Sequence, residues 1–195
     1  MSCLITKEAP EFAATAVMPD NSFRELSLST YRGKYVVLFF YPFDFTFVCP
    51  TEILGFDKKL NEFKELNTEI IGISTDSHHT HLAWKNTSTK EGGIGNIQYP
   101  LVADLDKNIS RAYEVLVNEE MALRGLFLID KEGIIRHYSV SDDPLGRNID
   151  ETLRLVKALQ FSEKHGVVCP ANWNDGDDTM KPNAEGVAKY LAEHV

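Results

Sequence analysis

The sequence contains little cysteine. Three cysteines occur in 195 residues, at positions 3, 49 and 169. A sparse and odd-numbered set is not the disulfide framework of a small secreted protein. A zinc site needs cysteine or histidine pairs at short spacing, whereas these cysteines lie 46 and 120 residues apart. Each cysteine is therefore expected to be a buried bystander or a redox-active group.

Long apolar runs and an excess of basic charge are also lacking. No apolar run approaches the roughly 20 residues that a membrane-spanning helix needs. The first residues show no basic region followed by an apolar core, as a signal peptide would. The 29 acidic residues outnumber the 20 basic ones, for a net charge of -9. This balance is poorly suited to nucleic acid or an anionic membrane. We expect a cytoplasmic protein with small substrates or protein partners.

Three histidines close together invite a metal-binding interpretation. His78 and His81 are three residues apart and could share a helix face with His79 beside them, but no cysteine or acid is spaced to converge with them. Residues 104–108 begin like a calcium loop, yet Ile109 stands where that loop needs glycine. We expect no metal and no cofactor.

The first half of the chain predicts alternating strands and helices. Residues 34–40 form a continuous run of β-branched and aromatic side chains, typical of a strand buried on both faces. Residues 69–74 indicate a second buried strand. Between them, residues 51–63 place apolar side chains at 53, 56, 60 and 63, on one face of a helix.

The second half continues the alternation and ends in a polar segment. We expect helices over 76–87, 110–114, 150–161 (with Leu153, Val156 and Leu159 facing inward) and 183–193, and strands over 125–130 and 134–140 joined by the turn at 131–133. This order predicts an α/β protein with a thioredoxin-like fold, a mixed central sheet flanked by helices, and a C-terminal extension. We expect a domain over residues 1–161 and a tail over 162–195, which is too short for its own core.

Cys49 is the most informative cysteine. It follows a buried strand and lies at the start of a predicted helix, with Pro50 suited to the first turn. A helix N-terminus presents free N–H groups and the positive end of a dipole, and both stabilise a thiolate. Chemistry at such a thiolate also needs hydrogen-bond donors placed where charge moves in the transition state. Thr46, backbone N–H groups near Cys49 and an arginine would supply them.

Several motifs resemble a known family. The pattern Pro42-x-x-x-Thr46-x-x-Cys49 is similar to the active-site motif of the peroxiredoxins, and the longer string over 39–52 resembles their typical two-cysteine subgroup. The resemblance continues nearly to the end of the chain, over residues 124–127, 146–154 and 165–170. It implies the thioredoxin-like fold and a peroxidase activity.

The resemblance implies roles for individual residues. Cys49 corresponds to the peroxidatic cysteine, Thr46 and Arg124 to the residues that contact thiolate and peroxide, and Pro42 to the residue that shields the pocket from water. No pattern in composition or spacing assigns these roles.

A second set of residues supports the first by the same resemblance. Glu52 and Arg147 resemble the residues that hold the active-site arginine, and Cys169 resembles the resolving cysteine, which the partner subunit supplies. Cys169 also lies in the polar tail, which is free to move, whereas Cys49 adjoins core strands; we expect the turn after Cys49 to unwind when they meet. Cys3, near the terminus, is expected to have no role.

The implied function is reduction of hydrogen peroxide and organic hydroperoxides. Cys49 becomes a sulfenic acid, an intersubunit disulfide with Cys169 follows, and thioredoxin reduces it. The resemblance also implies antioxidant defence and redox homeostasis, and a homodimer that assembles to a decamer. A ring-forming holdase chaperone or a redox relay is the alternative. A dithiol reductase would need Cys-x-x-Cys, but Thr46 stands three residues before Cys49.

Two segments bear on overoxidation. Residues 92–95, Gly-Gly-Ile-Gly, resemble a Gly-Gly-Leu-Gly loop of the family. Overoxidation-sensitive members carry Tyr-Phe in the C-terminal helix, whereas this chain has Tyr190-Leu191. The smaller side chain predicts a looser tail and reduced sensitivity to sulfinic acid formation.

Overall fold

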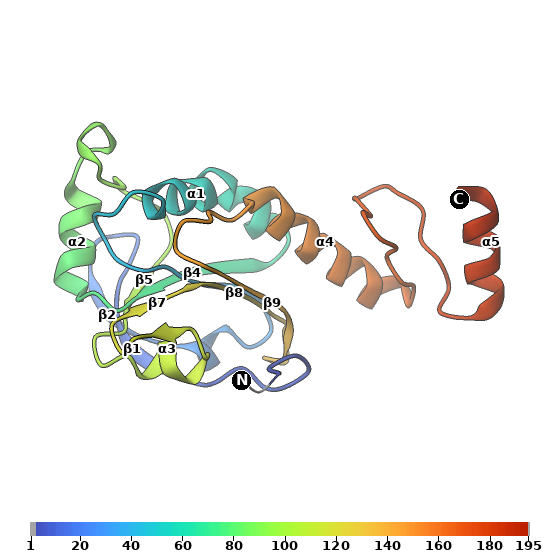
Figure 1. The fold of residues 1–195 in the computed structure, drawn as a ribbon, viewed down its shortest axis with the longest axis horizontal. Coiled ribbons are helices and arrows are strands. Elements are labelled where there is room, and N and C mark those ends of the chain that lie inside the picture. The colour runs from blue at the N-terminus through green and yellow to red at the C-terminus, as the bar shows by residue number, and fades with distance from the viewer. Residues whose placement is uncertain (1–2, 195) are drawn as a thin grey trace. The chain divides into compact units, whose positions relative to one another are not determined.

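The computed structural model describes residues 3–194, which divide into a compact unit up to Ile149 and a second from Asp150 onward. In the first unit the helices are α1 (Cys49–Glu65), α2 (His78–Asn86) and α3 (Asn108–Ala112), with short 3-10 turns η1 (Leu28–Tyr31) and η2 (Thr89–Glu91) (Figure 1). The strands are β1 (Ala13–Val17), β2 (Phe23–Ser27), β3 (Tyr35–Phe40), β4 (Thr68–Ser74), β5 (Leu101–Ala103), β6 (Leu116–Val117), β7 (Met121–Ala122), β8 (Arg124–Ile129) and β9 (Ile135–Ser141).

A seven-stranded mixed sheet is the frame of the first unit. Its strands lie in the order β2-β1-β5-β4-β3-β8-β9. The central strands β3, β4 and β5 run parallel, and antiparallel pairs extend the sheet on both sides. The hairpin of β8 and β9 leaves β9 at an edge.

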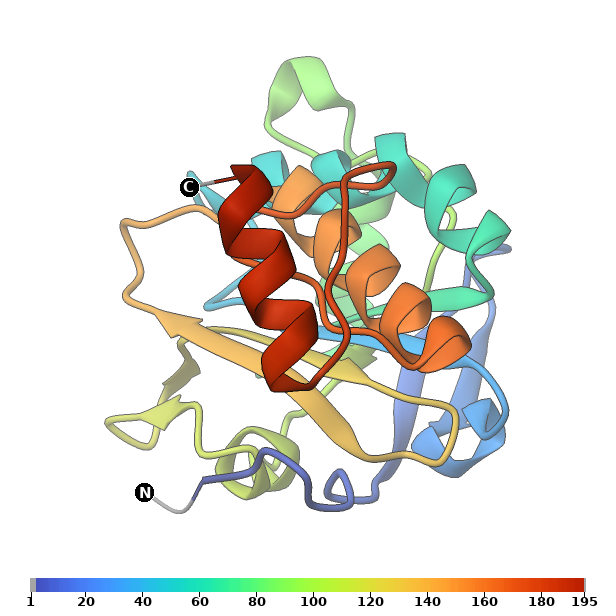
Figure 2. The ribbon, with the colours of Figure 1, turned by 90° about the vertical axis from the view of Figure 1, so that its right-hand side faces the viewer.

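Strand β3 separates two apolar layers. It is buried along its whole length, and its alternate side chains point to opposite faces. On one face Phe39 stacks on Phe56 of α1, with ring centroids 4.6 Å apart. On the other, Phe40 packs against Tyr113 at the end of α3, at 5.2 Å. Figures 1 and 2 show α1 and α3 on opposite sides of the sheet. The predicted mixed sheet with helices on both faces is confirmed.

Two helices of the first unit begin earlier than the sequence predicted. Helix α1 starts at Cys49 itself, not at residue 51, so the cysteine belongs to the first turn. Helix α3 covers Asn108–Ala112, whereas residues 110–114 were expected. The Asp104 carboxylate accepts the N–H groups of Ile109 and Ser110 at 3.0 and 2.7 Å, which fixes the start of α3.

The second unit starts within α4 (Ile149–His165) and ends with α5 (Ala184–His194). The prediction ended α4 at residue 161, but the helix continues to Gly166, whose φ of +64° terminates it. Leu153 and Val156 are buried as predicted, whereas Leu159 is half-buried.

The segment between α4 and α5 is held by contacts within the second unit. Val168 and Met180 pair as an antiparallel bridge. The Arg154 guanidinium donates to the Trp173 carbonyl at 2.8 Å, and the Trp173 ring is buried. The polar segment is therefore ordered around one tryptophan.

His194, at the end of α5, contacts Tyr190 and Asp178 of the same unit, and we call these contacts the His194 clasp. His194 Nδ1 lies 2.9 Å from the Tyr190 carbonyl, and Nε2 lies 3.1 Å from the Asp178 carboxylate. The carbonyl of Tyr190 and then the Asp178 carboxylate raise the pKa of His194. The neighbouring Leu191 is 48% exposed.

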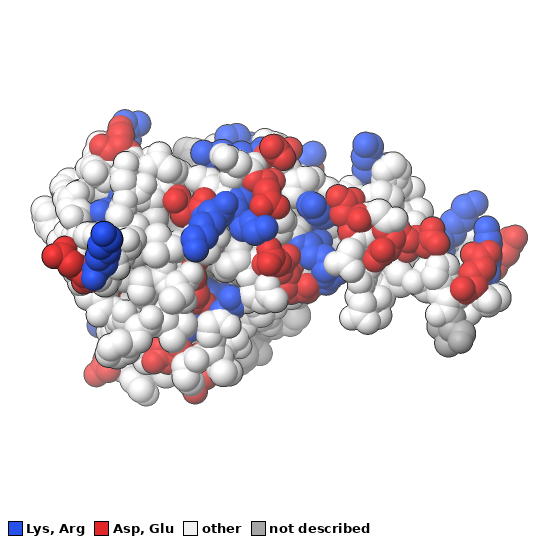
Figure 3. All heavy atoms as spheres, turned by 90° about the horizontal axis from the view of Figure 1, so that it is seen from above, with Lys and Arg blue, Asp and Glu red and all other residues white. Residues whose placement is uncertain are grey.

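The surface has no strong bias toward one charge on the face drawn in Figure 3, where basic and acidic side chains are interspersed. Within residues 3–194, no helix combines the length and the apolar character needed to cross a membrane.

Candidate active site

Cys49 lies at the point where the loop after β3 becomes helix α1. Its side chain is fully buried, and Pro50 follows in the first turn. The Val48 carbonyl accepts the N–H of Thr51 at 3.0 Å and the Thr51 hydroxyl at 2.6 Å, which closes that turn. The sulfur therefore sits at the positive end of the helix dipole.

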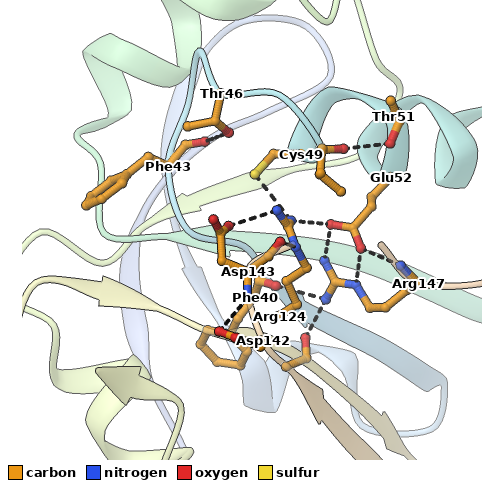
Figure 4. A network of polar contacts seen from close by, with 12 residues as sticks. Phe40, Phe43, Thr46, Cys49, Thr51, Glu52, Arg124, Asp142, Asp143 and Arg147 are labelled. Atoms are coloured by element: carbon orange, nitrogen blue, oxygen red, sulfur yellow. Dashed lines mark hydrogen bonds and ion pairs between the residues drawn. The ribbon is translucent and has the colours of Figure 1, made fainter. Parts of the chain in front are cut away.

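Arg124, the first residue of β8, is the cation beside this sulfur. Its Nη1 lies 3.3 Å from Cys49 Sγ (Figure 4). The arginine side chain is 1% exposed. Burial opposes its charge, but the hydrogen bonds and charges of Cys49 and Glu52 raise the pKa of Arg124 above its ordinary value. A permanent cation thus faces Cys49.

Glu52, one turn after Cys49, joins two arginines. Its Oε2 accepts Arg124 Nη1 and Arg147 Nη2, each at 2.7 Å, and its Oε1 accepts Arg147 Nε at 2.7 Å. Burial alone would raise the pKa of Glu52, but hydrogen bonds and the charge of Arg147, with a contribution from Arg124, hold it below its ordinary value. Glu52 is therefore an anion that orients Arg124.

Arg147 anchors this network to the sheet. Its Nη1 donates to the carbonyls of Phe40 at 2.8 Å and Gly125 at 2.7 Å, at the ends of β3 and β8. Its guanidinium also lies over the Phe39 ring, 5.2 Å from the centroid. The structure thus brings together Cys49 and Glu52 from α1, Arg124 from β8, and Arg147 from the loop before residue 149.

Thr46 and Pro42 lie in the loop between β3 and α1. The Thr46 hydroxyl donates to the Phe43 carbonyl at 2.8 Å, and among the described residues no hydrogen bond joins it to Cys49. This differs from the expectation that Thr46 contacts the thiolate, because its proton is engaged in the turn of its own loop. Pro42 is buried at the end of β3.

Two contacts to the site were missed by the sequence analysis. Asp143, in the loop after β9, accepts from Arg124 through its backbone carbonyl at 2.5 Å and through its carboxylate at 3.0 Å. Asp44 anchors the active-site loop, since its buried carboxylate contacts His81 Nδ1 and the Tyr41 hydroxyl, each at 2.8 Å. No motif or spacing joins these residues; the one signal was that Asp44 lies within the string 39–52 that resembles the family motif.

The side chains of His78, His79 and His81 have separate surroundings. His81 is buried between Asp44 and the Val102 carbonyl, whereas the rings of His78 and His79 pack edge-on against Phe23. Within residues 3–194, no group of three or more histidine, cysteine, aspartate and glutamate side chains is arranged to hold a metal ion.

All three cysteines lie within the described residues and are free thiols. Cys169 is half-buried in the second unit, with its sulfur 3.6 Å from the Ala158 carbonyl. Burial, partly opposed by Arg154, raises the pKa of Cys169, so this thiol is protonated at neutral pH. Cys3 is exposed.

Comparison with known proteins gives the same picture. The chain matches the AhpC/TSA family over residues 5–138 and the C-terminal domain of 1-Cys peroxiredoxin over residues 158–193. It is 55% identical to peroxiredoxin-1 of Gallus gallus, over 97% of this chain and 96% of that protein. It is 54% identical to a mitochondrial thioredoxin-dependent peroxide reductase of Drosophila melanogaster, over 97% and 82% respectively. The reduced 2-Cys peroxiredoxin of Plasmodium vivax superposes with a TM-score of 0.97 at 52% identity, over 98% of this chain and all of that one.

Proposed function

The chain belongs to the peroxiredoxins of the AhpC/TSA family, and from that premise we propose that Cys49 is the cysteine that attacks the hydroperoxide. The protein is a thiol peroxidase with an antioxidant function. The observation that carries the assignment is a buried arginine 3.3 Å from a cysteine sulfur at a helix N-terminus. Hydrogen peroxide and organic hydroperoxides are the proposed substrates.

In the proposed first step, the Cys49 thiolate attacks the terminal oxygen of the hydroperoxide. An S–O bond forms as the O–O bond breaks, so the sulfur is oxidised to a sulfenic acid and the peroxide is reduced. The leaving oxygen departs as alkoxide, or as hydroxide from hydrogen peroxide, and takes a proton from water. Arg124 stabilises the negative charge as it moves from sulfur to the leaving oxygen.

The loop residues position the hydroperoxide in this proposal. The Thr46 hydroxyl donates its proton to the Phe43 carbonyl, so its lone pairs are left to accept the hydroperoxide O–H. Buried Pro42 offers no N–H and limits the access of water. Glu52 and Arg147 hold Arg124 in place.

Cys169 is the proposed resolving cysteine, supplied by the partner subunit. Its thiol sulfur attacks the sulfenic sulfur of Cys49, a disulfide forms, and water leaves. Thioredoxin, the reductant named for the Drosophila melanogaster relative, is the proposed dithiol that returns both cysteines to thiols. In this scheme residues 1–161 are the peroxidase domain and residues 162–195 are the tail that brings Cys169.

The proposed assembly is a homodimer that builds a decamer. Strand β9 supports the dimer, since it lies at an edge of the sheet, where a second chain could extend the strand order. Intersubunit resolution requires the tail of one subunit to reach the Cys49 of the other.

A non-reducing gel tests the cysteine assignments. Reduced protein treated with one equivalent of hydrogen peroxide should give a covalent dimer, which both Cys49→Ser and Cys169→Ser abolish. Cys3→Ser is the matched control and should leave the dimer intact. A disulfide within the monomer would overturn intersubunit resolution, and thioredoxin-coupled turnover in Cys49→Ser would overturn the role of Cys49.

A further inference from the structure

Asp143 is an unexpected member of the active-site network. It takes two of the donors of Arg124: Nε donates to its backbone carbonyl at 2.5 Å, and Nη2 donates to its carboxylate at 3.0 Å. Figure 4 shows Asp143 and Glu52 on different sides of the guanidinium, with Nη1 directed at Cys49. The guanidinium of Arg124 is therefore held by Asp143 on one side and by Glu52 on the other.

The exposure of Asp143 distinguishes it from Glu52. The Glu52 side chain is 2% exposed, whereas the Asp143 side chain is 54% exposed. Glu52 is thus screened from the solvent by protein, while the Asp143 carboxylate contacts Arg124 and is also exposed to solvent.

The charges of the network do not balance. Arg124 and Arg147 contribute two positive charges, and Glu52, Asp143 and the Cys49 thiolate contribute three negative ones. The count covers the groups that contact Arg124 or Arg147; Asp142 adds a further negative charge next to them, since its carboxylate accepts the Asp143 N–H at 2.8 Å. The exposed Asp143 carboxylate therefore contributes to a net negative charge of the site in the state that reacts.

We propose that Asp143 is a positioning and specificity-determining residue, which orients Arg124 and disfavours hydroperoxides that carry a negative charge. The inference rests on the proposed role of Arg124 at Cys49. Two like unit charges about 7 Å apart in water-like surroundings repel enough to change a rate about threefold. A neutral hydroperoxide does not experience this repulsion.

The positioning role follows from the geometry of the guanidinium. Arg124 has one donor group, Nη1, that faces both Cys49 and Glu52, at 3.3 and 2.7 Å. Loss of the Asp143 carboxylate would leave Nη2 without that acceptor, so that only the Asp143 backbone carbonyl and Glu52 would hold the guanidinium. Asparagine retains an oxygen at this place, whereas alanine does not, so the two variants separate charge from position.

The experiment measures oxidation of Cys49 in a Cys169→Ser background, where the first step is followed alone. The probes are a short aliphatic hydroperoxide with a carboxylate and its neutral methyl ester. We expect Asp143→Asn to raise the ratio of the second-order rate constants, anion over ester, about threefold at low salt. The gain should largely disappear near 0.5 M salt, where the screening length falls to about 4 Å.

Asp143→Ala tests the positioning role. It should lower the rate constant for the neutral ester at least severalfold below that of Asp143→Asn, whose amide oxygen retains an acceptor for Nη2. The control is Glu25→Gln, an exposed acid on β2 at the opposite edge of the sheet, which removes the same charge from the molecule. It should leave the ratio unchanged.

Three results would overturn the inference. They are an unchanged anion-to-ester ratio in Asp143→Asn, an equal change in Glu25→Gln, or ester kinetics in Asp143→Ala that match those of Asp143→Asn. Arg124→Lys keeps this outcome distinct from failure of the proposed function. If Arg124→Lys leaves the rate with hydrogen peroxide unchanged, the role of Arg124 is wrong; if it lowers that rate while Asp143→Asn has no effect on the ratio, the role of Asp143 alone is wrong.

Discussion

Glu52 is a single buried carboxylate that compensates two buried cations. Glu52→Gln keeps the shape of the side chain but leaves Arg124 and Arg147 with less negative charge. Removal of one partner from a buried ion pair costs about 3–5 kcal/mol. We expect the free energy of unfolding at pH 7, measured with urea, to fall by that amount. Peroxidase activity should fall as well, because Glu52 orients Arg124.

The same substitution predicts a pH dependence. The folded protein holds the pKa of Glu52 below its ordinary value of 4.5. Its stabilising contribution is therefore complete above pH 4.5 and is lost as the pH falls through the lower, folded value. The stability gap between the parent protein and Glu52→Gln should narrow below pH 4.5. Glu62→Gln, on the exposed side of α1 in an ion pair with Lys59, should change stability little; a comparable loss there would contradict the prediction.

At this scale the sequence predicted the centre of the site but not its margin. Cys49, Glu52, Arg124 and Arg147 were found because each belongs to a motif. Asp143 was not found, because its contact depends on the path of the loop after β9, and no sequence pattern encodes that path.

Among the elements, α5 connects packing with chemistry. Leu191 is half-exposed on this helix, next to Tyr190. Leu191→Phe creates the Tyr-Phe pair that the family resemblance associates with sensitivity to overoxidation. The larger side chain also offers more apolar surface for docking of the tail. We expect slower disulfide formation and a severalfold higher fraction of Cys49 sulfinic acid at a given peroxide concentration, measured by mass spectrometry. Leu105→Phe, on an exposed loop of the first unit, should not change that fraction.

The His194 clasp predicts that the tail responds to pH. Contacts with Tyr190 and Asp178 raise the pKa of His194 above its ordinary value of 6.5. The stabilisation of the tail by these contacts is complete below pH 6.5. It is lost as the pH rises through the pKa that His194 has in the folded protein. We expect protease to cut the segment 172–183 faster at pH 8 than at pH 6, relative to an unstructured peptide.

His194→Asn is the test of that response. The variant should show the same relative cleavage rate at both pH values, because its side chain does not titrate. A pH effect as large as that of the parent protein would assign the response to another group.

The elements also show where periodicity is informative. The strands β3 and β4 and the helix α1 were predicted because long apolar runs or a clear helical face mark them. β1, β2 and β5 were not predicted. β5 has three residues, and β2 buries one side chain, Leu26, so neither offers a pattern. Tertiary pairing, rather than local sequence, determines these strands.

For the whole molecule, the proposed dimer forms across the edge strand β9. Val140 is an exposed apolar side chain on this edge strand. In a dimer formed across β9, Val140→Lys introduces one cation from each subunit. We expect the dimer dissociation constant, measured by analytical ultracentrifugation, to rise at least about tenfold. Leu105→Lys places the same charge on an exposed loop; if it dissociates the dimer equally, β9 is not the seam.

The mixed sheet with helices on both faces was predictable from a few physical rules, whereas the full strand order was not, because β1, β2 and β5 gave no signal. A buried parallel pair needs a crossover helix, and the hairpin must add antiparallel strands beside it. The extent of α4 was less predictable, since the helix ends at His165, before the left-handed Gly166, rather than where the apolar pattern ends near residue 161.

Because two arginines anchor Glu52, the chain between Glu52 and Cys49 limits how far Cys49 can move. Cys49 is three residues from Glu52, and the turn between them is closed by contacts to the Val48 carbonyl. Those contacts can open without disturbing the buried ion pairs. Three residues of extended chain span about 10 Å. In the proposed cycle, the oxidised Cys49 sulfur can therefore move up to about 10 Å from the anchored Glu52. A resolving thiol must come within that distance of Glu52 to form a disulfide.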